Sequence, residues 1–221
     1  MTETQGTGGR PPLTIDMVSD YVCPWCYVGF ASLGWSIMAL SFERALEVRY
    51  RPYRLRPETP PGGVDRAAAL AAKFPDPAER EAMREHLDQA AQDAGLAFDP
   101  SAPERLPDTT DAHRVTRWAH EDGLQREVAQ RLFEGYWRDG LDIGRAEVLG
   151  VLAGEAGMDA AAVEARLATG EDRADVAEEA AAFRQGGVDG VPTFIVDEET
   201  GFAGALPKAR LLDALRQLSQ P

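Results

Sequence analysis

The alternation of hydrophobic and polar residues predicts a strand-helix-strand unit in the first third of the chain. Residues 13–18, Leu-Thr-Ile-Asp-Met-Val, alternate with the two-residue period of a half-buried strand. Pro24 suits the first turn of a helix that extends to Leu40, and residues 46–55 form a second strand candidate. Hydrophobic residues recur at helical spacing within the helix: Phe30, Leu33, Ile37 and Leu40.

The middle and the end of the chain follow a different pattern. Residues 64–185 are rich in Ala, Glu and Arg and are interrupted by glycines and prolines, which predicts a series of helices. Strand character returns at residues 192–196, followed by a turn at 197–201, a short partner strand at 202–205 and an amphipathic helix at 208–218. The predicted order is β-α-β, helices, β-β-α, so strands of one sheet come from both ends of the chain.

The composition is that of a globular protein without affinity for nucleic acid. The 221 residues are 44% hydrophobic and 27% charged, which allows a sizeable core. Acidic residues number 37 against 23 basic ones, and the formal net charge of -14 repels phosphate backbones and anionic bilayers. We therefore expect neither nucleic acid nor membrane as a partner, and a monomer or a homodimer remains open.

The N-terminal segment lacks the features of a targeting signal. Residues 1–12 form a lead without the apolar centre of a secretory signal, and no stretch reaches the roughly 18 apolar residues that a membrane helix needs. We therefore expect a cytoplasmic protein if the sequence is the full precursor. Stable disulfides are rare in that compartment.

Both cysteines of the chain lie in the motif Cys23-Pro24-Trp25-Cys26. Chance places two cysteines at this spacing in about one sequence in a hundred. The motif lies where the first strand meets the helix, which puts Cys23 near the N-cap, beside unpaired backbone N–H groups and the positive end of the helix dipole. An ordinary cysteine has a pKa of about 8.5, and such a position lowers it. We therefore expect Cys23 to be a reactive thiolate.

Cys26, one helical turn further, is placed to resolve a mixed disulfide formed at Cys23. A structural disulfide would close so short a loop that its entropic gain is only about 2 kcal/mol. A zinc site needs two more ligands, and His86, His113 and His120 lack the usual spacing of a ligand pair. Inert buried thiols do not explain the Pro-Trp pair at a helix start. Redox chemistry is the favoured interpretation, with no metal, flavin or nucleotide.

The order of elements resembles the DsbA-like branch of the thioredoxin superfamily. More closely, four segments are similar to the FrnE-like subfamily, which is related to 2-hydroxychromene-2-carboxylate isomerases and kappa-class glutathione transferases. These segments are Ser19–Tyr27, Arg51–Tyr53, Asp111–Arg114 and Gly190–Phe194. The resemblance covers nearly the whole chain and implies an α/β thioredoxin-like fold with an all-helical insertion domain.

This fold divides the chain into four parts. Residues 1–12 are the flexible lead, and residues 13–63 and 186–221 form the two parts of the thioredoxin-like domain. Residues 64–185 form the insertion domain.

The resemblance also implies roles for individual residues. In this family the cysteine at the position of Cys23 attacks the substrate disulfide, and the cysteine at the position of Cys26 resolves the mixed disulfide. The residue at the position of Pro192 is a cis-proline that faces both cysteines. A cis bond at this position turns the backbone of Val191 outward beside the sulfurs, where its N–H and C=O would pair with an extended substrate. Val191 and Pro192 are therefore expected to bind the substrate.

Three side chains beside these residues have two possible roles each. Trp25, next to Pro24 at the edge of the expected substrate site, either contacts an unfolded peptide or aromatic ligand or packs on the insert. His113 either faces the sulfurs or a ligand, or forms hydrogen bonds within the insert. Asp20 either accepts a proton or forms a turn.

The expected function is dithiol-disulfide exchange on protein disulfides or on a small thiol, as an oxidase, a reductase or an isomerase. One alternative is a glutathione-dependent isomerase or transferase that acts on a small aromatic or polyketide-like substrate, with glutathione as co-substrate. The two sulfurs argue against it, because such relatives usually carry a serine in place of the attacking cysteine. A second alternative is a non-enzymatic holdase that binds unfolded chains on an apolar surface of the insert.

Overall fold

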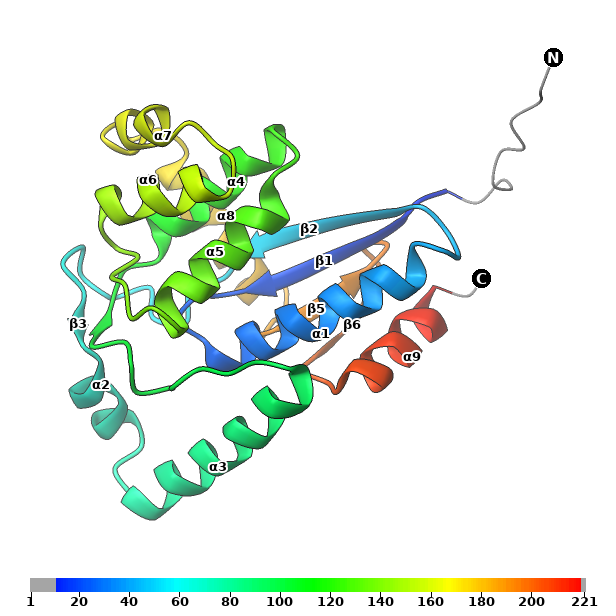
Figure 1. The fold of residues 1–221 in the computed structure, drawn as a ribbon, viewed down its shortest axis with the longest axis horizontal. Helices are drawn as coiled ribbons and strands as arrows, with labels where there is room; N and C mark the ends of the chain where they lie inside the picture. Colours follow the sequence, from blue (N-terminus) through cyan, green and yellow to red (C-terminus); the bar gives the residue numbers. More distant parts are fainter. Residues whose placement is uncertain (1–10, 220–221) are drawn as a thin grey trace.

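Four strands form a mixed sheet at the centre of the molecule (Figure 1). The computed structural model describes residues 11–219, so most of the predicted N-terminal lead lies outside the described residues. The strand order is β2-β1-β5-β6, in which β1 runs parallel to β2 and antiparallel to β5. The strands are β1 (Leu13–Ser19), β2 (Leu46–Pro52), β5 (Thr193–Val196) and β6 (Thr200–Ala203).

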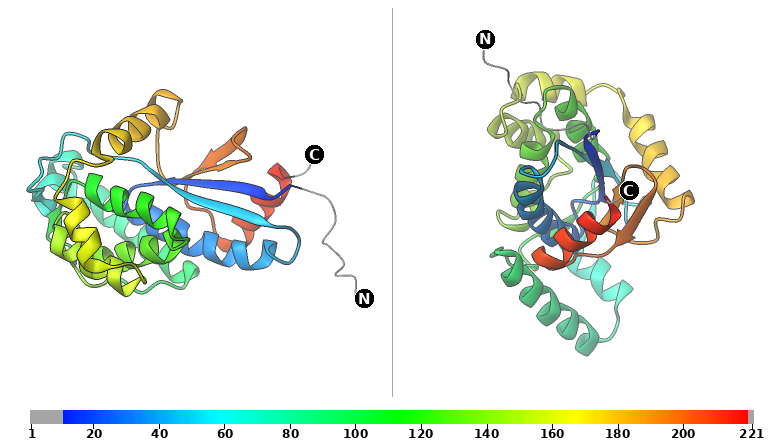
Figure 2. Two further views of the ribbon diagram at one scale, coloured as in Figure 1. Left: turned by 90° about the horizontal axis from the view of Figure 1, so that it is seen from above. Right: turned by 90° about the vertical axis from the view of Figure 1, so that its right-hand side faces the viewer.

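Helices cover both faces of this sheet (Figure 2). On one face, α1 (Pro24–Leu40) packs against α9 (Lys208–Leu218). On the other face, α8 (Arg173–Gln185) lies against β2. The β1-α1-β2 and β5-β6-α9 units together make the thioredoxin-like fold that the sequence predicted, which is confirmed.

The segment between β2 and β5 is mainly helical. A short antiparallel pair, β3 (Val64–Asp65) and β4 (Arg105–Leu106), adds two strands that the all-helical description of the insert did not include. The predicted domain boundaries at residues 63/64 and 185/186 stay a prediction. Besides α8, the helices of this segment are α2 (Arg66–Lys73), α3 (Pro77–Ala94), α4 (Thr110–Glu121), α5 (Gln125–Trp137), α6 (Ala146–Glu155) and α7 (Ala160–Leu167).

The strand β1 is more deeply buried than its alternating pattern predicted. Its polar residues Asp16 and Ser19 are only 5% and 2% exposed, because helices cover both faces of the sheet. Asp16 accepts two hydrogen bonds from the Arg49 guanidinium of β2, at 2.6 and 2.7 Å. The half-buried interpretation of this strand was wrong, and a paired charge makes the deeper burial tolerable.

The hairpin between β5 and β6 is tighter than predicted. Asp197 and Glu198 adopt positive φ angles of 50° and 61°, which reverse the chain within a short turn. As a result β6 begins at Thr200, two residues before the predicted start at Phe202. The predicted turn at 197–201 is therefore confirmed in place but is shorter, because both central residues adopt left-handed backbone angles.

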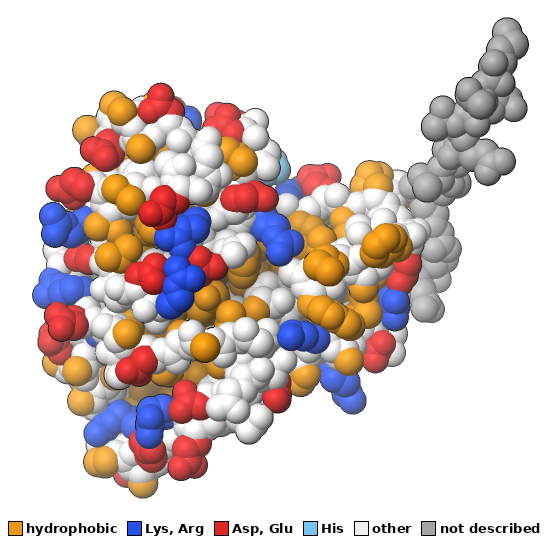
Figure 3. All heavy atoms as spheres, in the orientation of Figure 1, with side chains coloured by type: hydrophobic (Ala, Val, Ile, Leu, Met, Phe, Trp, Pro, Cys, Tyr) orange, Lys and Arg blue, Asp and Glu red, His pale blue; other side chains and the backbone are white. Residues whose placement is uncertain are grey.

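On the face shown in Figure 3, large hydrophobic side chains gather over the second half of α1. Trp35 and Met38 are 43% and 65% exposed there.

A bilayer-crossing helix must be long and continuously apolar, and residues 11–219 contain no helix that meets both conditions.

Candidate active site

Cys23 connects the end of β1 to the start of α1. Its backbone N–H donates to the carbonyl of Asp20 at 3.0 Å, which closes the turn between the two elements. The backbone of Cys23 is extended, with φ -94° and ψ 114°, and Pro24 is the first residue of the helix. The predicted N-cap position of Cys23 is confirmed.

The thiol of Cys23 does not cap the helix, however. Its Sγ lies 3.6 Å from the carbonyl oxygen of Val191, to which the thiol donates, and no side-chain capping bond forms. The expected capping contact is therefore wrong for the thiol, because a protonated sulfur is a donor and the helix N-terminus offers only further donors.

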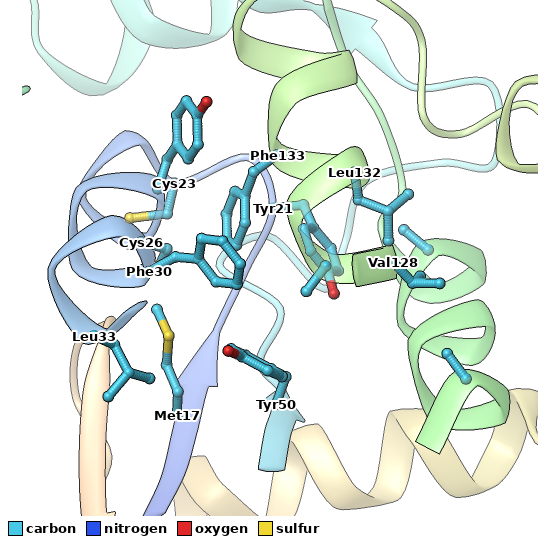
Figure 4. Packing of buried hydrophobic residues seen from close by; sticks show 14 of the residues in the cluster. Met17, Tyr21, Cys23, Cys26, Phe30, Leu33, Tyr50, Val128, Leu132 and Phe133 are labelled. Carbon is cyan, nitrogen blue, oxygen red and sulfur yellow. The ribbon is translucent and has the colours of Figure 1, made fainter. Parts of the chain in front are cut away.

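Cys26 lies one turn inside α1 and is 0% exposed, whereas Cys23 is 5% exposed. Burial raises the pKa of the Cys26 thiol well above its ordinary value, and a hydrogen bond with the neighbouring Cys23 raises it further. Both cysteines border the aromatic core between α1 and α5, beside Phe30 and Phe133 (Figure 4). The two sulfurs are therefore neighbours, and Cys23 is the more exposed of the two cysteines.

The loop that covers Cys23 contains a cis peptide bond between Val191 and Pro192, as the resemblance implied. The Pro192 ring packs on α1 at Gly29, where an added Cβ would lie 2.8 Å from Pro192 Cγ. Gly29 thus allows the loop to approach the helix that carries the cysteines. Sequence reasoning missed this glycine, whose only signal is its place three residues after Cys26.

Pro24 and Trp25 line a groove between α1, α2 and α3, which we call the Trp25 groove. Its volume is about 220 Å³. The Trp25 ring packs edge-on against the exposed His86 of α3, with ring centroids 5.2 Å apart, so this tryptophan both contacts the insert and borders an open space. The rest of the lining is mainly apolar and includes Leu70, Phe74, Met83 and Leu87, together with Arg66.

His113 was given two possible roles, and the structure shows it bonded to a carbonyl group outside the predicted insert, while a role in substrate binding stays a prediction. The residue is 4% exposed, and its Nε2 lies 3.0 Å from the carbonyl oxygen of Tyr53. Its ring lies 4.9 Å from that of Tyr21 and lines a different cavity, beside Gln125 and His120. His113 therefore joins α4 to the segment after β2 and has no place in the Trp25 groove.

Asp20 forms the turn before the cysteine motif, as one of its two interpretations predicted. Its Oδ2 accepts a hydrogen bond from the N–H of Leu55 at 2.8 Å. Its Oδ1 is buried and has no hydrogen-bond partner within residues 11–219, and it lies 3.7 Å from His113 Nε2. The role of proton acceptor stays a prediction.

The chain shares sequence and fold with known proteins over nearly its full length. The family model of the DsbA-like thioredoxin domain matches residues 14–216. The uncharacterized protein YwbO of Bacillus subtilis (strain 168) is 28% identical over 196 residues, which are 88% of this chain and 91% of YwbO.

Solved structures show the same likeness. The probable DsbA oxidoreductase SCO1869 from Streptomyces coelicolor superposes with a TM-score of 0.83 at 29% identity, and the match covers 95% of this chain and 92% of that one. The cytosolic disulfide reductase DsbM from Pseudomonas aeruginosa, solved with GSH, superposes with a TM-score of 0.64 at 21% identity over 92% of this chain and 99% of DsbM. The second likeness is one of fold alone.

Proposed function

The chain belongs to the DsbA-like thioredoxin domain family, and we propose that it is a thiol-disulfide oxidoreductase whose redox pair is Cys23 and Cys26. One arrangement carries the proposal. Cys23 starts α1 with a small open surface, Cys26 lies buried beside it, and the cis Val191–Pro192 loop lies against Cys23.

In the reductive direction, the Cys23 thiolate attacks one sulfur of a substrate disulfide. A bond forms between Cys23 Sγ and that sulfur, and the other substrate sulfur leaves as a thiolate and takes up a proton. Cys26 then loses its proton and attacks Cys23 Sγ, which forms the Cys23–Cys26 disulfide and releases the second substrate sulfur to be protonated. Two electrons pass to the substrate, and the reverse sequence oxidises a dithiol.

The different surroundings of the two thiols support these roles. The raised pKa of Cys26 keeps its thiol protonated near neutral pH, so that it does not compete with Cys23 for the substrate. Deprotonation of Cys23 removes its bond to Val191 and frees that carbonyl for an N–H of an extended substrate. We assign Val191, Pro192, Pro24 and Trp25 to the substrate site.

The direction of exchange depends on the reduction potential of the pair relative to its surroundings, and about 30 mV corresponds to a tenfold change in the equilibrium constant. In the cytoplasm, the expected compartment, the glutathione pool favours the dithiol form. The protein would then reduce or isomerise disulfides of protein substrates, and glutathione would regenerate the dithiol.

The experiment that tests this proposal compares Cys23→Ser and Cys26→Ser with the wild type on a disulfide-bonded peptide, followed by mass spectrometry. We expect turnover by the wild type, a trapped mixed disulfide at Cys23 in Cys26→Ser, and no adduct in Cys23→Ser. The double serine variant is the control for non-specific adducts.

Exchange that survives in Cys23→Ser would contradict the proposal. Glutathione-dependent turnover of a small aromatic substrate by that variant would indicate an isomerase or transferase instead. Suppression of aggregation by a wild type that shows no exchange would indicate a holdase.

A further inference from the structure

Arg66, the first residue of α2, is a buried cation in the Trp25 groove. It is only 9% exposed and lines the groove together with Pro24 and Trp25. Its guanidinium lies over the ring of Trp137, with Cζ 5.1 Å from the ring centroid. The charge is therefore held on an aromatic floor next to the cysteine motif.

This guanidinium has no ion-pair partner within residues 11–219. The hydroxyl of Tyr136 is its hydrogen-bonding neighbour, but that group is neutral and donates its own proton to the Arg105 carbonyl at 2.9 Å. The carboxylate of Asp99 attracts the charge without pairing with it, and accepts its hydrogen bonds from the Ser101 N–H and hydroxyl at 2.8 and 2.6 Å. Within residues 11–219, no carboxylate forms an ion pair with Arg66.

The two other arginines of the groove have partners. Arg80 donates to the carbonyl of Phe74 at 2.5 Å, and Arg84 pairs with the carboxylate of Glu81 at 2.6 Å. Arg66 therefore differs from both arginines in its burial, and from Arg84 also in having no ion-pair partner within residues 11–219.

Such a group is costly to the folded state. A guanidinium has five N–H donors, and one tyrosine oxygen satisfies few of them. Desolvation lowers the pKa of Arg66, and a buried charge without an ion-pair partner destabilises the folded state. A buried, uncompensated charge beside a reactive group is typical of a ligand-binding position.

We propose that Arg66 binds a carboxylate of the substrate, and that this substrate is a peptide segment with an acidic residue and a large apolar residue close to its reactive cysteine. The inference rests on the proposed function, because disulfide exchange at Cys23 is the reason why the peptide carries a reactive cysteine.

The groove begins at the residues that follow Cys23 in the chain. Pro24 and Trp25 form part of its wall, so a peptide joined to Cys23 by a mixed disulfide borders directly on it. An extended peptide advances about 3.3 Å per residue, which brings residues near the cysteine into the groove. The apolar side chain would cover the hydrophobic lining, and the carboxylate would form a two-pronged ion pair with Arg66.

The lining of the groove favours a peptide over glutathione. Glutathione carries two carboxylates but no large apolar group, so it would leave the hydrophobic wall in contact with water. That wall comprises Leu70, Phe74, Met83 and Leu87. A peptide with both an apolar and an acidic residue matches the wall and the cation together.

The test uses two peptides that are identical except for one residue, Glu or Gln, near a cysteine that is disulfide-bonded to a chromophoric thiol. A leucine lies between the variable residue and the cysteine. We expect the wild-type kcat/KM to be about 10- to 100-fold higher for the Glu peptide, as a charge-assisted hydrogen bond provides. Arg66→Gln should remove this preference, so that this variant reacts with the Glu and Gln peptides at the same rate.

Arg216→Gln is the matched control, because Arg216 is an exposed arginine of α9 that pairs with Glu43 outside the groove. It removes one positive charge and should keep the preference. A preference that persists in Arg66→Gln, or its absence in an active wild type, would overturn the inference. An equal effect of Arg66→Gln on reduction of glutathione disulfide would also overturn it, since a small anion would then be the ligand.

A binding experiment separates this inference from the proposed function. The same peptides with S-methylated cysteine cannot exchange, and their binding to Cys23→Ser is measured by fluorescence anisotropy. Tighter binding of the Glu peptide that disappears on adding Arg66→Gln supports the role of Arg66 even if no exchange is found. Equal binding of both peptides contradicts it whether or not the protein catalyses exchange.

Discussion

Within residues 11–219, two buried arginines lie over tryptophan rings, and they differ in their hydrogen-bond partners. Arg114 of α4 is 0% exposed, with its Cζ 5.0 Å from the ring centroid of Trp118, and Arg66 lies 5.1 Å from that of Trp137. The Arg114 guanidinium donates to the Asp111 carboxylate at 2.8 Å. It also donates to four backbone carbonyls, those of Arg166, Leu167, Thr169 and Glu171.

The difference shows how a structural charge is distinguished from a functional one. The donors of Arg114 bind the last two residues of α7 and the loop that follows, so the side chain holds both to α4. Those of Arg66 point at a neutral hydroxyl and an open groove. Burial and an aromatic floor are common to both, and only the hydrogen-bond partners reveal which charge the fold itself uses.

Two acidic residues, one near Arg114 and one near the cysteines, differ in their hydrogen bonds in the same way. Asp172, which follows α7, accepts a hydrogen bond from Trp118 Nε1 at 2.7 Å. Near the cysteines, the Oδ1 of Asp20 is buried without a hydrogen-bond partner in the described part of the chain. The carboxylate of Asp172 is therefore used by a hydrogen bond that holds the helices together, whereas one oxygen of Asp20 is left without a hydrogen bond among the described residues.

The largest effect on stability is expected from Arg114→Met. We expect the free energy of unfolding to fall by about 3–5 kcal/mol, because four backbone carbonyl groups, in bonds that are buried or part-buried, lose their donor. Urea unfolding followed by circular dichroism measures the loss. Arg114→Lys, which keeps the charge without the planar fork, should lose less and remain folded if the methionine variant does not. A loss under about 1 kcal/mol in the methionine variant would contradict the structural role of Arg114.

A smaller and pH-dependent effect is expected at Cys26. Because its pKa is raised in the folded state, its contribution to stability is complete below the unfolded-state pKa of about 8.5. Above that pH the unfolded chain releases the proton first, so stability falls by about 1.4 kcal/mol per pH unit until the folded-state pKa is reached. Urea unfolding of the reduced protein at several pH values measures this slope.

Cys26→Ala provides the comparison for this measurement, because it lacks the titrating thiol and keeps the other groups that ionise at high pH. The two stability profiles should diverge above about pH 8.5. Parallel profiles would show that the thiol is not desolvated in the folded state.

The smallest effect on stability is expected from Arg66→Met. Replacement of an uncompensated buried charge by an apolar side chain in an apolar groove should change the free energy of unfolding by less than about 1 kcal/mol, or increase it. The measurement is the same urea unfolding as for Arg114→Met. A loss of stability as large as in Arg114→Met would show that both arginines stabilise the fold, and it would contradict the difference between them.

Local patterns were sufficient to predict the elements that form the sheet and its neighbours. The helices Pro24–Leu40 and Lys208–Leu218 begin and end where hydrophobic spacing and proline placed them, because these signals act between residues a few positions apart. The Cys-x-x-Cys motif at the start of α1 followed from the same local rules.

Contacts between distant segments decided the rest. The thiol of Cys23 meets the carbonyl of Val191, which is 168 residues away, and His113 is bound to a carbonyl 60 residues away. The burial of Arg66 depends on Tyr136 and Trp137 of another helix. Spacing along the chain determines which face of a helix or strand is apolar. The hydrogen-bond partner of a polar group depends instead on which distant segment packs against it. The candidate reactive residues could therefore be identified from the sequence. Their hydrogen bonds, and the place of Arg66 beside them without an ion pair among the described residues, became apparent only in the structure.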